Sequence, residues 1–431
     1  MRAPLVVPAL LYLGSIAAAQ HVGFEFAPPL ATEEIASATI QGIVASDVSA
    51  RSWGDSFELL AGDGRRYAAG VNETVTVGEH LVVRGRIVPF DPPRNPDEPS
   101  QREFARERGL TARLVGGRIL SRAPPDRFDL RTLPARMRAA ANATLHRYLS
   151  EPDATILAGM LYGARGALPP ELRAEFQDTG TVHVLVTAGL HLGVVAALLT
   201  FAFTRIGIGR IPASLAAIPL IWLYAILSGA HVPSLRAATM VSVALAARAL
   251  GERPISINTL ALAAIVVATL WPAWVAGASF GLSFSCVAAI ALFADGISGA
   301  LERARVPAPL REALALTLST QIGVWPLTAS TFLVIAPYAA PANLFVVPVV
   351  GVALTLGLVL LGAGPIPPVA QVVAHIAAWP LAWIESAVHL TARLPYAHVV
   401  ATPPPPWSLA CYDAMMVAAS ALLRATAGKT R

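Results

Sequence analysis

Hydrophobic residues are distributed unevenly along the chain, and their pattern divides it into two parts. From about residue 182 onward, apolar runs of about 20 residues recur, which is the length a helix needs to cross about 30 Å of hydrocarbon. We expect spans at 183–204, 211–229, 236–250, 256–274, 276–294, 312–333, 338–361, 367–392 and 407–423. With the leading apolar segment, the pattern predicts a polytopic α-helical membrane protein of about nine to ten spans.

Residues 1–20 carry one early arginine, an apolar centre and a small-residue end. This pattern is typical of either a secretory signal or a first membrane helix. In both cases the following segment is expected on the outer side, because a basic N-terminus tends to stay in the cytoplasm.

Residues 33–122 alternate between apolar and polar positions, with glycine at the turns and an Asp63-Gly64 turn signal. Alternation of this kind predicts a small antiparallel barrel or sandwich. The phrase GEHLVVRGRI favours an OB-like β-barrel, exported to the outer side. Residues 91–104 are expected to form a polar, proline-rich insertion in it.

Residues 126–181 have mixed charge and moderate apolar content. We expect a linker of amphipathic helices here, lying against the membrane face or against the bundle. Residues 182–423 are then the transmembrane domain, and residues 424–431 a basic cytoplasmic tail.

Charge agrees with a membrane location, because only 14% of residues are charged, against about 25% in soluble domains. The loops expected in the cytoplasm collect arginines, whereas the alternate loops contain few. This distribution follows the positive-inside rule. It predicts a multi-pass protein of the cytoplasmic (inner) membrane with its N-terminal domain outside.

Two histidines, His183 and His191, stand eight residues apart at the start of the first predicted span of the bundle. Eight residues are about 2.2 helical turns, which puts both on one face. Ionisable residues in a span usually face the protein interior or a wet cavity, although ordinary interfacial histidines fit the same spacing. No metal or cofactor is expected, because two imidazoles need further ligands. The motifs Gly-x-Ser-x-Gly and His-Glu-x-x-His are absent, which favours a transporter over an enzyme.

The stretch GTVHVLVTAGLHLG at 180–193 closely resembles a motif of the ComEC family of competence proteins. Three further stretches resemble elements of that family in the same order: LYGARGALPPELRAEFQDTG before it, then VPSLRAATM and SFGLSF after it. Asn343, Leu344 and Pro348 fit a fourth. The resemblance covers about residues 35–360, and Ala188 stands where the family usually has serine.

This resemblance implies a channel that carries single-stranded DNA across the cytoplasmic membrane during natural transformation. The implied partners are single-stranded DNA, membrane lipids, a separate nuclease, a DNA receptor and a cytoplasmic motor, and a homo-oligomer is compatible with it. The candidate translocation path consists of His183, Gly189, His191, Arg236, Asn343 and Pro348. The interrupted segment 336–348 is expected to line the pore, or to be a packing-driven helix kink.

Residues 102–122 contain six arginines and two glutamates, which could attract phosphates. The candidate DNA contacts are Arg102, Arg106, Arg108, Arg113 and Arg118. A solvated sheet face explains the same residues.

One departure from the family is large. Many members end in a metallo-β-lactamase-like domain, whose His-x-His-x-Asp-His motif is absent here. No nuclease is therefore assigned to this chain. Two other classes of function remain open: a membrane-embedded enzyme or assembly factor that acts on a lipid or peptide, and a homologue without transport activity.

Overall fold

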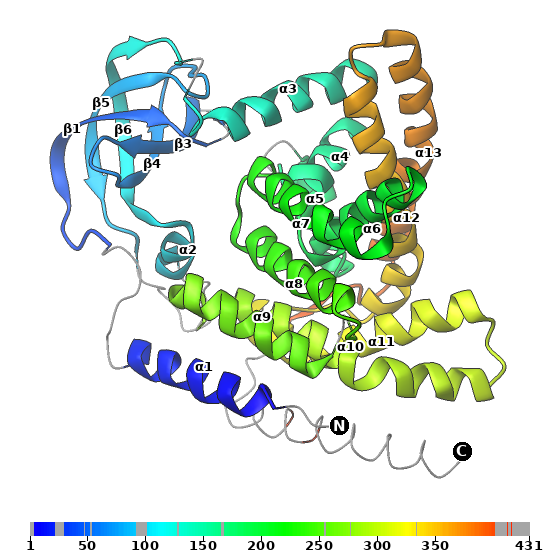
Figure 1. The fold of residues 1–431 in the computed structure, drawn as a ribbon. Helices are drawn as coiled ribbons and strands as arrows, with labels where there is room; N and C mark the ends of the chain where they lie inside the picture. The colour runs from blue at the N-terminus through cyan, green and yellow to red at the C-terminus, as the bar shows by residue number, and fades with distance from the viewer. Residues whose placement is uncertain are drawn as a thin grey trace.

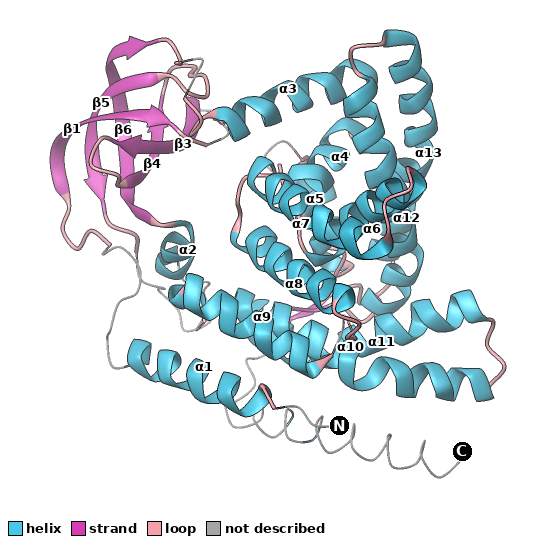
Figure 2. Cartoon of the chain, viewed as in Figure 1, coloured by secondary structure: helices cyan, strands magenta, loops and turns pink. Residues whose placement is uncertain are grey.

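A computed structural model describes residues 4–21, 30–46, 48–51, 54–91, 101–126, 129–164, 168–253, 256–275, 277–332, 334–400, 412 and 415. A small β domain lies beside a larger body of helices, and one long helix reaches from the first to the second (Figure 1). Helices and strands are segregated, as Figure 2 shows. The expected division into a β-rich N-terminal part and a helical remainder is confirmed.

The β domain is a six-stranded sheet in the order β1-β5-β6-β4-β3-β2. Its strands are β1 (Ile35–Val44), β2 (Ser49–Arg51), β3 (Gly54–Ala61), β4 (Arg66–Val71), β5 (His80–Val88) and β6 (Leu110–Ala123). Because β1 also pairs with β3, the pairings through five of the strands close into a circuit. Every pairing in it is antiparallel except β4 with β6. The OB-like barrel stays a prediction.

Strand β3 shows why this part of the chain forms a sheet. Its residues alternate between buried and partly exposed positions, which places Phe57 and Leu59 in the core of the domain. The turn to β4 forms at the predicted Asp63-Gly64, where the Gly64 amide donates to Ala61 O at 3.0 Å. Gly64 has a φ of +85°, which favours glycine.

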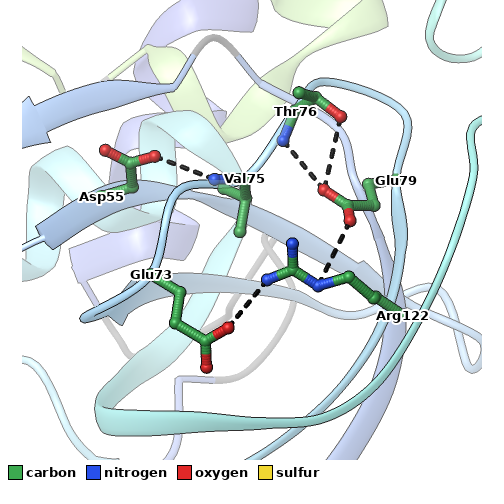
Figure 3. Close-up of polar contacts among 6 residues, drawn as sticks. All are labelled: Asp55, Glu73, Val75, Thr76, Glu79 and Arg122. Carbon is green, nitrogen blue, oxygen red and sulfur yellow. Dashed lines mark hydrogen bonds and ion pairs between the residues drawn. The ribbon is translucent and has the colours of Figure 1, made fainter.

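Carboxylates hold the connection between β4 and β5 in place (Figure 3). Asp55 accepts a hydrogen bond of 3.0 Å from the Val75 amide, and Glu79 accepts one of 3.0 Å from the Thr76 amide. Arg122 donates to Glu73 at 2.9 Å and lies 3.6 Å from Glu79. One arginine of the basic segment therefore serves the structure of the domain.

Residues 92–100 of the expected polar insertion lie outside the described residues, and α2 (Gln101–Arg108) begins near its end. Glutamine, arginine, glutamate and alanine are good helix formers, so the segment QREFARER folds into two turns. Gly109, with a φ of +66°, ends the helix and leads into β6.

The helical body is built from α3 onward, and α1 lies alongside it (Figure 1). Its helices are α3 (Leu133–Tyr148), α4 (Asp153–Tyr162), α5 (Pro170–Asp178), α6 (Gly189–Arg205), α7 (Arg210–Leu227), α8 (Val232–Ala249), α9 (Ile257–Leu270), α10 (Ala278–Arg303), α11 (Ala308–Phe332), α12 (Ala339–Ala363) and α13 (Pro367–Ala392). Short 3-10 turns η1 (Val182–Leu185) and η2 (Pro272–Trp274) precede α6 and α10. A two-stranded ribbon pairs β7 (Val334–Ile335) with β8 (Val399–Val400).

Eight of the nine predicted bundle spans coincide with helices α6 to α13, but the expected count of about nine to ten spans is too high. Within the described residues, three helices are long and apolar enough to cross a membrane: α7, α10 and α12. The other helices are too short or too polar: α9, for example, has 14 residues, which extend only about 21 Å. The predicted span 407–423 and the tail 424–431 lie outside the described residues, apart from Tyr412 and Met415.

The linker 126–181 does not consist only of amphipathic surface helices. Helix α4 is buried from Ala154 to Tyr162 and lies at the centre of the largest hydrophobic cluster, against α12 and α13. Its sequence ATILAGMLY is apolar on all sides, so burial requires protein on all sides. The prediction failed because a ten-residue apolar helix is too short to be recognised as a span.

Helix α1 (Val6–His21) lies along α9 and is tied to it near both ends. Leu5 donates to Asn258 Oδ1 at 3.2 Å, and Gln20 donates to Pro272 O at 2.9 Å. The two helices therefore run parallel.

The expected interruption at 336–348 is wrong for most of its length. Helix α12 is continuous from Ala339 and contains Pro348 within it, and the break lies before it, at the β7 ribbon. A proline near the middle of a long helix is accommodated as a local distortion rather than a break.

Candidate polar junction at the helix starts

The segment that contains the two histidines does not form one helix. His183 lies in η1, where its Nδ1 is 3.1 Å from Gly180 O and its side chain is exposed. His191 lies in the first turn of α6 and is fully buried. The extended residues between them separate the two, so the expected shared helical face is wrong.

Three side-chain hydrogen bonds bring three helix starts together. Ser234, in the first turn of α8, donates to Thr187 O at 2.7 Å, just before α6. Arg236 of α8 donates from Nη2 to Ser279 Oγ at 2.7 Å and to Ser283 Oγ at 3.1 Å, both in α10. Segments about 45 residues apart in sequence thus meet. We call the six residues the polar junction: Thr187, His191, Ser234, Arg236, Ser279 and Ser283.

The junction is polar although it lies inside an apolar body. Arg236 is 1% exposed and Thr187 is 1% exposed. Among the described residues, the His191 Nε2 and Thr187 Oγ1 atoms find no hydrogen-bond partner. A buried polar atom without a partner costs about 1–3 kcal/mol, so such atoms mark places that accept water or a ligand.

The start of α12 also reaches this region. Gly180 has a φ of +68°, and a β-carbon on it would lie 2.8 Å from the Ala339 β-carbon. This close approach explains why glycine occupies the position. Asn343, one turn further along α12, has a buried Oδ1 with no hydrogen-bond partner in the described part of the chain.

The remaining path candidates are placed differently. Gly189 is exposed at the start of α6, with open space beside its α-carbon. Pro348 is exposed on α12. The structure therefore joins Arg236 to the segment that carries His191, and it leaves Pro348 on the surface of the body.

Two of the candidate DNA-binding arginines fix the chain beside Phe90. Arg102 donates to Phe90 O at 2.9 Å. Arg113 donates to Asp91 at 3.0 Å, and its guanidinium lies 5.8 Å from the centre of the Phe90 ring. Both residues therefore help to hold the segment after β5 in the β domain.

The other candidates are exposed. Arg106 and Arg108 lie on α2, and Arg108 pairs with Glu58 of β3. Arg118 lies on β6 directly opposite Arg84 of β5. Like charges at opposed positions destabilise a sheet, so this pair favours a surface that meets negative charge.

Sequence reasoning missed the role of Ser279. This residue accepts the shorter of the two hydrogen bonds that Arg236 donates to α10. A signal was present, because Ser279 and Ser283 are four residues apart and therefore share one face of α10.

A carboxylate cluster lies at the start of α4, next to α13. Burial, together with the nearby charges of Glu385 and Glu151, raises the pKa of Asp153 from 3.8 to about 6. Glu151 also lies 2.8 Å from His146 Nδ1. Among the described residues, no group of three or more histidine, cysteine or acidic side chains could hold a metal ion.

The fold and the junction define a membrane protein, with apolar helices gathered around a buried polar site and a small β domain beside them. A sequence model of the Competence protein family matches residues 160–425, which is more than half of the chain. The chain belongs to this family, which confirms the resemblance to ComEC proteins.

One curated relative supports the assignment. The chain is 30% identical over 201 residues to ComE operon protein 3 of Bacillus subtilis (strain 168), which covers 46% of this chain and 25% of that protein. The matched region thus spans a quarter of the relative's length. No solved structure matches the chain.

Proposed function

We propose that this protein forms the membrane channel for single-stranded DNA in natural transformation. Membership of the Competence family and the similarity to ComE operon protein 3 support DNA uptake as the process. The polar junction supports passage through the helical body. It is the observation that carries the proposal, because ionisable side chains buried inside a membrane protein usually face its interior or a water-filled cavity and mark the path of a substrate.

Arg236 would be the residue that meets the phosphates. Its guanidinium keeps its charge at every physiological pH and matches phosphate oxygens through paired hydrogen bonds. In the structure, the neutral hydroxyls of Ser279 and Ser283 accept from it. A phosphate that replaced them would pair a negative charge with the guanidinium, so a passing strand could displace the serines one step at a time.

The β domain would receive the strand on the outer side. Its closed circuit of pairings, with one parallel pair, supports an OB-like barrel, a fold that binds single strands. The exposed arginines Arg106, Arg108 and Arg118 would attract the backbone. Helix α1 runs parallel to α9, so the end of α1 that precedes the β domain in sequence lies near the start of α10.

The channel works with partners in this proposal. A nuclease, a DNA receptor and a cytoplasmic motor would supply strand separation, capture and driving force. Lipids of the cytoplasmic membrane would surround the apolar helices, whose exposed residues include Phe201, Trp325 and Trp379.

An in-frame deletion strain tests the proposal with fluorescently labelled DNA. We expect DNA to bind at the cell surface but not to reach the cytoplasm, and the wild-type gene to restore its arrival. Normal arrival in the deletion strain would contradict the channel. If a gene encoding Arg236→Gln also restored the arrival of DNA in the cytoplasm, Arg236 would not be needed for transport. The assembly-factor interpretation would then be the better one.

A further inference from the structure

We infer that the turns between α6 and α7 (205–210) and between α8 and α9 (248–253) form one surface that binds the headgroups of anionic phospholipids. We call these two turns the basic turn surface. Its arginines meet the lipid phosphates, and one exposed aliphatic side chain in each turn enters the edge of the hydrocarbon. This inference concerns the surrounding lipid and does not rest on the proposed passage of DNA.

The two turns lie at the same end of the helical body. Helices α6 and α8 start together, because the first turn of α8 is hydrogen-bonded to the segment just before α6. One hydrophobic cluster then includes residues along both helices, from 192 to 203 in α6 and from 237 to 245 in α8. The helices have 17 and 18 residues, so each extends about 26 Å. Their far ends, and the turns that follow them, therefore lie together.

The turn between α6 and α7 lies at a membrane boundary. Helix α7 is long and apolar enough to cross a membrane, and Arg210 is its first residue. On the other side of the turn, the guanidinium of Arg205 lies 4.9 Å from the ring centre of Phe201, which is 57% exposed on α6. Long basic side chains near the ends of membrane helices extend to the headgroup layer. This turn is therefore placed at the level of the headgroups.

Positive charge on the basic turn surface is not neutralised by the fold. Four exposed arginines and one exposed glutamate lie in the two turns, which gives a net charge of +3: Arg205, Arg210, Arg248, Arg253 and Glu252. Within the part of the chain that the structure describes, none of the four arginines forms an ion pair with a carboxylate. In the β domain, in contrast, Arg66, Arg86 and Arg122 each pair with a glutamate. The arginines of the turns are thus available to an anion outside the protein.

Helix dipoles account for only two of these arginines. Arg205 and Arg248 lie in the last turns of α6 and α8, where a positive charge complements the dipole. Arg210 begins α7, and at that end of a helix the dipole opposes a positive charge. Arg253 lies beyond the last turn of α8. A lipid phosphate beside Arg210 and Arg253 would explain both.

Exposed aliphatic side chains identify the anion as a lipid. Ile206 is 75% exposed and Leu250 is 82% exposed, and each lies between two of the arginines in its turn. Basic and aliphatic side chains on one surface are typical of segments that bind at the boundary between headgroups and acyl chains. Four or more basic residues next to a membrane helix favour anionic lipids. A free phosphate or a DNA backbone would meet the charges but would leave both aliphatic side chains in water.

Thermal unfolding of the full-length protein in a neutral detergent tests this inference, because a ligand of the folded state raises the unfolding temperature. The probes are short-chain phosphatidylglycerol, short-chain phosphatidylcholine and glycerol 3-phosphate, which lacks acyl chains. The wild type should bind phosphatidylglycerol at least tenfold more tightly than either of the other two. Arg210→Gln together with Arg253→Gln should weaken phosphatidylglycerol binding about 25-fold, or about fivefold per arginine.

A second variant separates a lipid from a free phosphate. Ile206→Ser together with Leu250→Ser keeps every charge, so it should weaken phosphatidylglycerol binding about tenfold and leave glycerol 3-phosphate binding unchanged. The matched control is Leu130→Ser together with Arg131→Gln. This leucine is 78% exposed beside an exposed arginine just before α3, and its variant should bind phosphatidylglycerol like the wild type.

Three results would overturn the inference. The first is equal binding of phosphatidylglycerol and phosphatidylcholine by the wild type. The second is wild-type affinity for phosphatidylglycerol in the arginine variant. The third is an arginine variant that loses binding of a single-stranded oligonucleotide but keeps that of phosphatidylglycerol, which would assign the surface to nucleic acid. Unfolding temperatures that match the wild type in the absence of lipid show that the variants are folded.

Discussion

The Nη2 atom of Arg236 lies 2.7 Å from the Oγ atom of Ser279, and this hydrogen bond ties the first turns of α8 and α10 together. The guanidinium is 1% exposed. The serine hydroxyls that accept from this buried positive charge are neutral. A negatively charged partner could therefore replace them.

Replacing the two serines should weaken transport without unfolding the protein. Hydrogen bonds to charged groups contribute about 1.5–3 kcal/mol, so Ser279→Ala together with Ser283→Ala should lower cytoplasmic arrival of labelled DNA about tenfold or more. Ser330→Ala is the matched control, because Ser330 donates to Leu327 O within its own helix. Equal transport in all three proteins would reduce the serines to packing residues.

Lysine should not replace Arg236. Lys carries the same charge, but its ammonium lacks the planar fork that pairs with two phosphate oxygens at once, and the Nη2 atom that donates to both serines is lost. Transformation frequency of Arg236→Lys should fall close to that of Arg236→Gln, while the amount of protein in the membrane stays normal. A frequency near wild type for Arg236→Lys would show that charge alone suffices.

Gly180 should tolerate no side chain. A methyl group there would lie 2.8 Å from the Ala339 β-carbon, and its φ of +68° costs a non-glycine residue about 1 kcal/mol. Gly180→Ala should therefore lower the unfolding temperature in detergent by several degrees. Gly189→Ala, in the same motif but with open space around it, should unfold like the wild type. The same loss in both variants would argue against the close contact with α12.

Stability should depend on pH through Asp153. Its pKa rises from 3.8 to about 6 in the folded protein, so the folded state binds the proton more tightly than the unfolded state. The contribution of this group to stability is greatest below about pH 4 and is lost as pH rises toward 6. Asp153→Asn should therefore raise the unfolding temperature at pH 7.5 and change it little at pH 4.

The control for this prediction is Glu252→Gln, an exposed carboxylate at the end of α8. It should shift the unfolding temperature equally at both pH values. A pH-independent effect of Asp153→Asn would contradict the raised pKa.

Glu58 should restrain DNA binding by the β domain. Its carboxylate pairs with Arg108 and lies 3.8 Å from Arg66, so it occupies positive charge that a phosphate could use. Glu58→Gln should tighten binding of a single-stranded oligonucleotide severalfold and make it more sensitive to salt, by about 0.7 in the logarithmic slope per phosphate gained. Glu33→Gln removes the same charge from an exposed position and should have a smaller effect. If Glu58→Gln binds the oligonucleotide with unchanged affinity, DNA does not contact the arginines beside Glu58.

Local sequence patterns predicted those parts of the fold that local physics determines. Alternation in β3 and the Asp63-Gly64 turn gave the hairpin, and long apolar runs gave α10 and α12. In contrast, α4 was missed because its burial depends on α12 and α13, which come about 200 residues later in the chain. No window centred on α4 contains that information.

The candidate site was also predicted only where local sequence determines it. The motif singled out His191 and Arg236, but spacing suggested that His183 and His191 share a helical face, which the break at Val186 prevents. The partnership of Arg236 with Ser279 joins residues 43 positions apart, and it emerges only when α8 and α10 fold against each other. Pairing across that distance cannot be deduced from periodicity.

The most direct test of the channel is to trap DNA inside the helical body. A photo-crosslinking amino acid at Gly189, where open space accommodates it, would lie beside the polar junction, and the same residue at Trp379 would face lipid. In transforming cells, the account predicts a covalent adduct with incoming DNA from position 189 and lipid adducts alone from position 379. DNA adducts absent from position 189, in cells that still take up DNA, would contradict it.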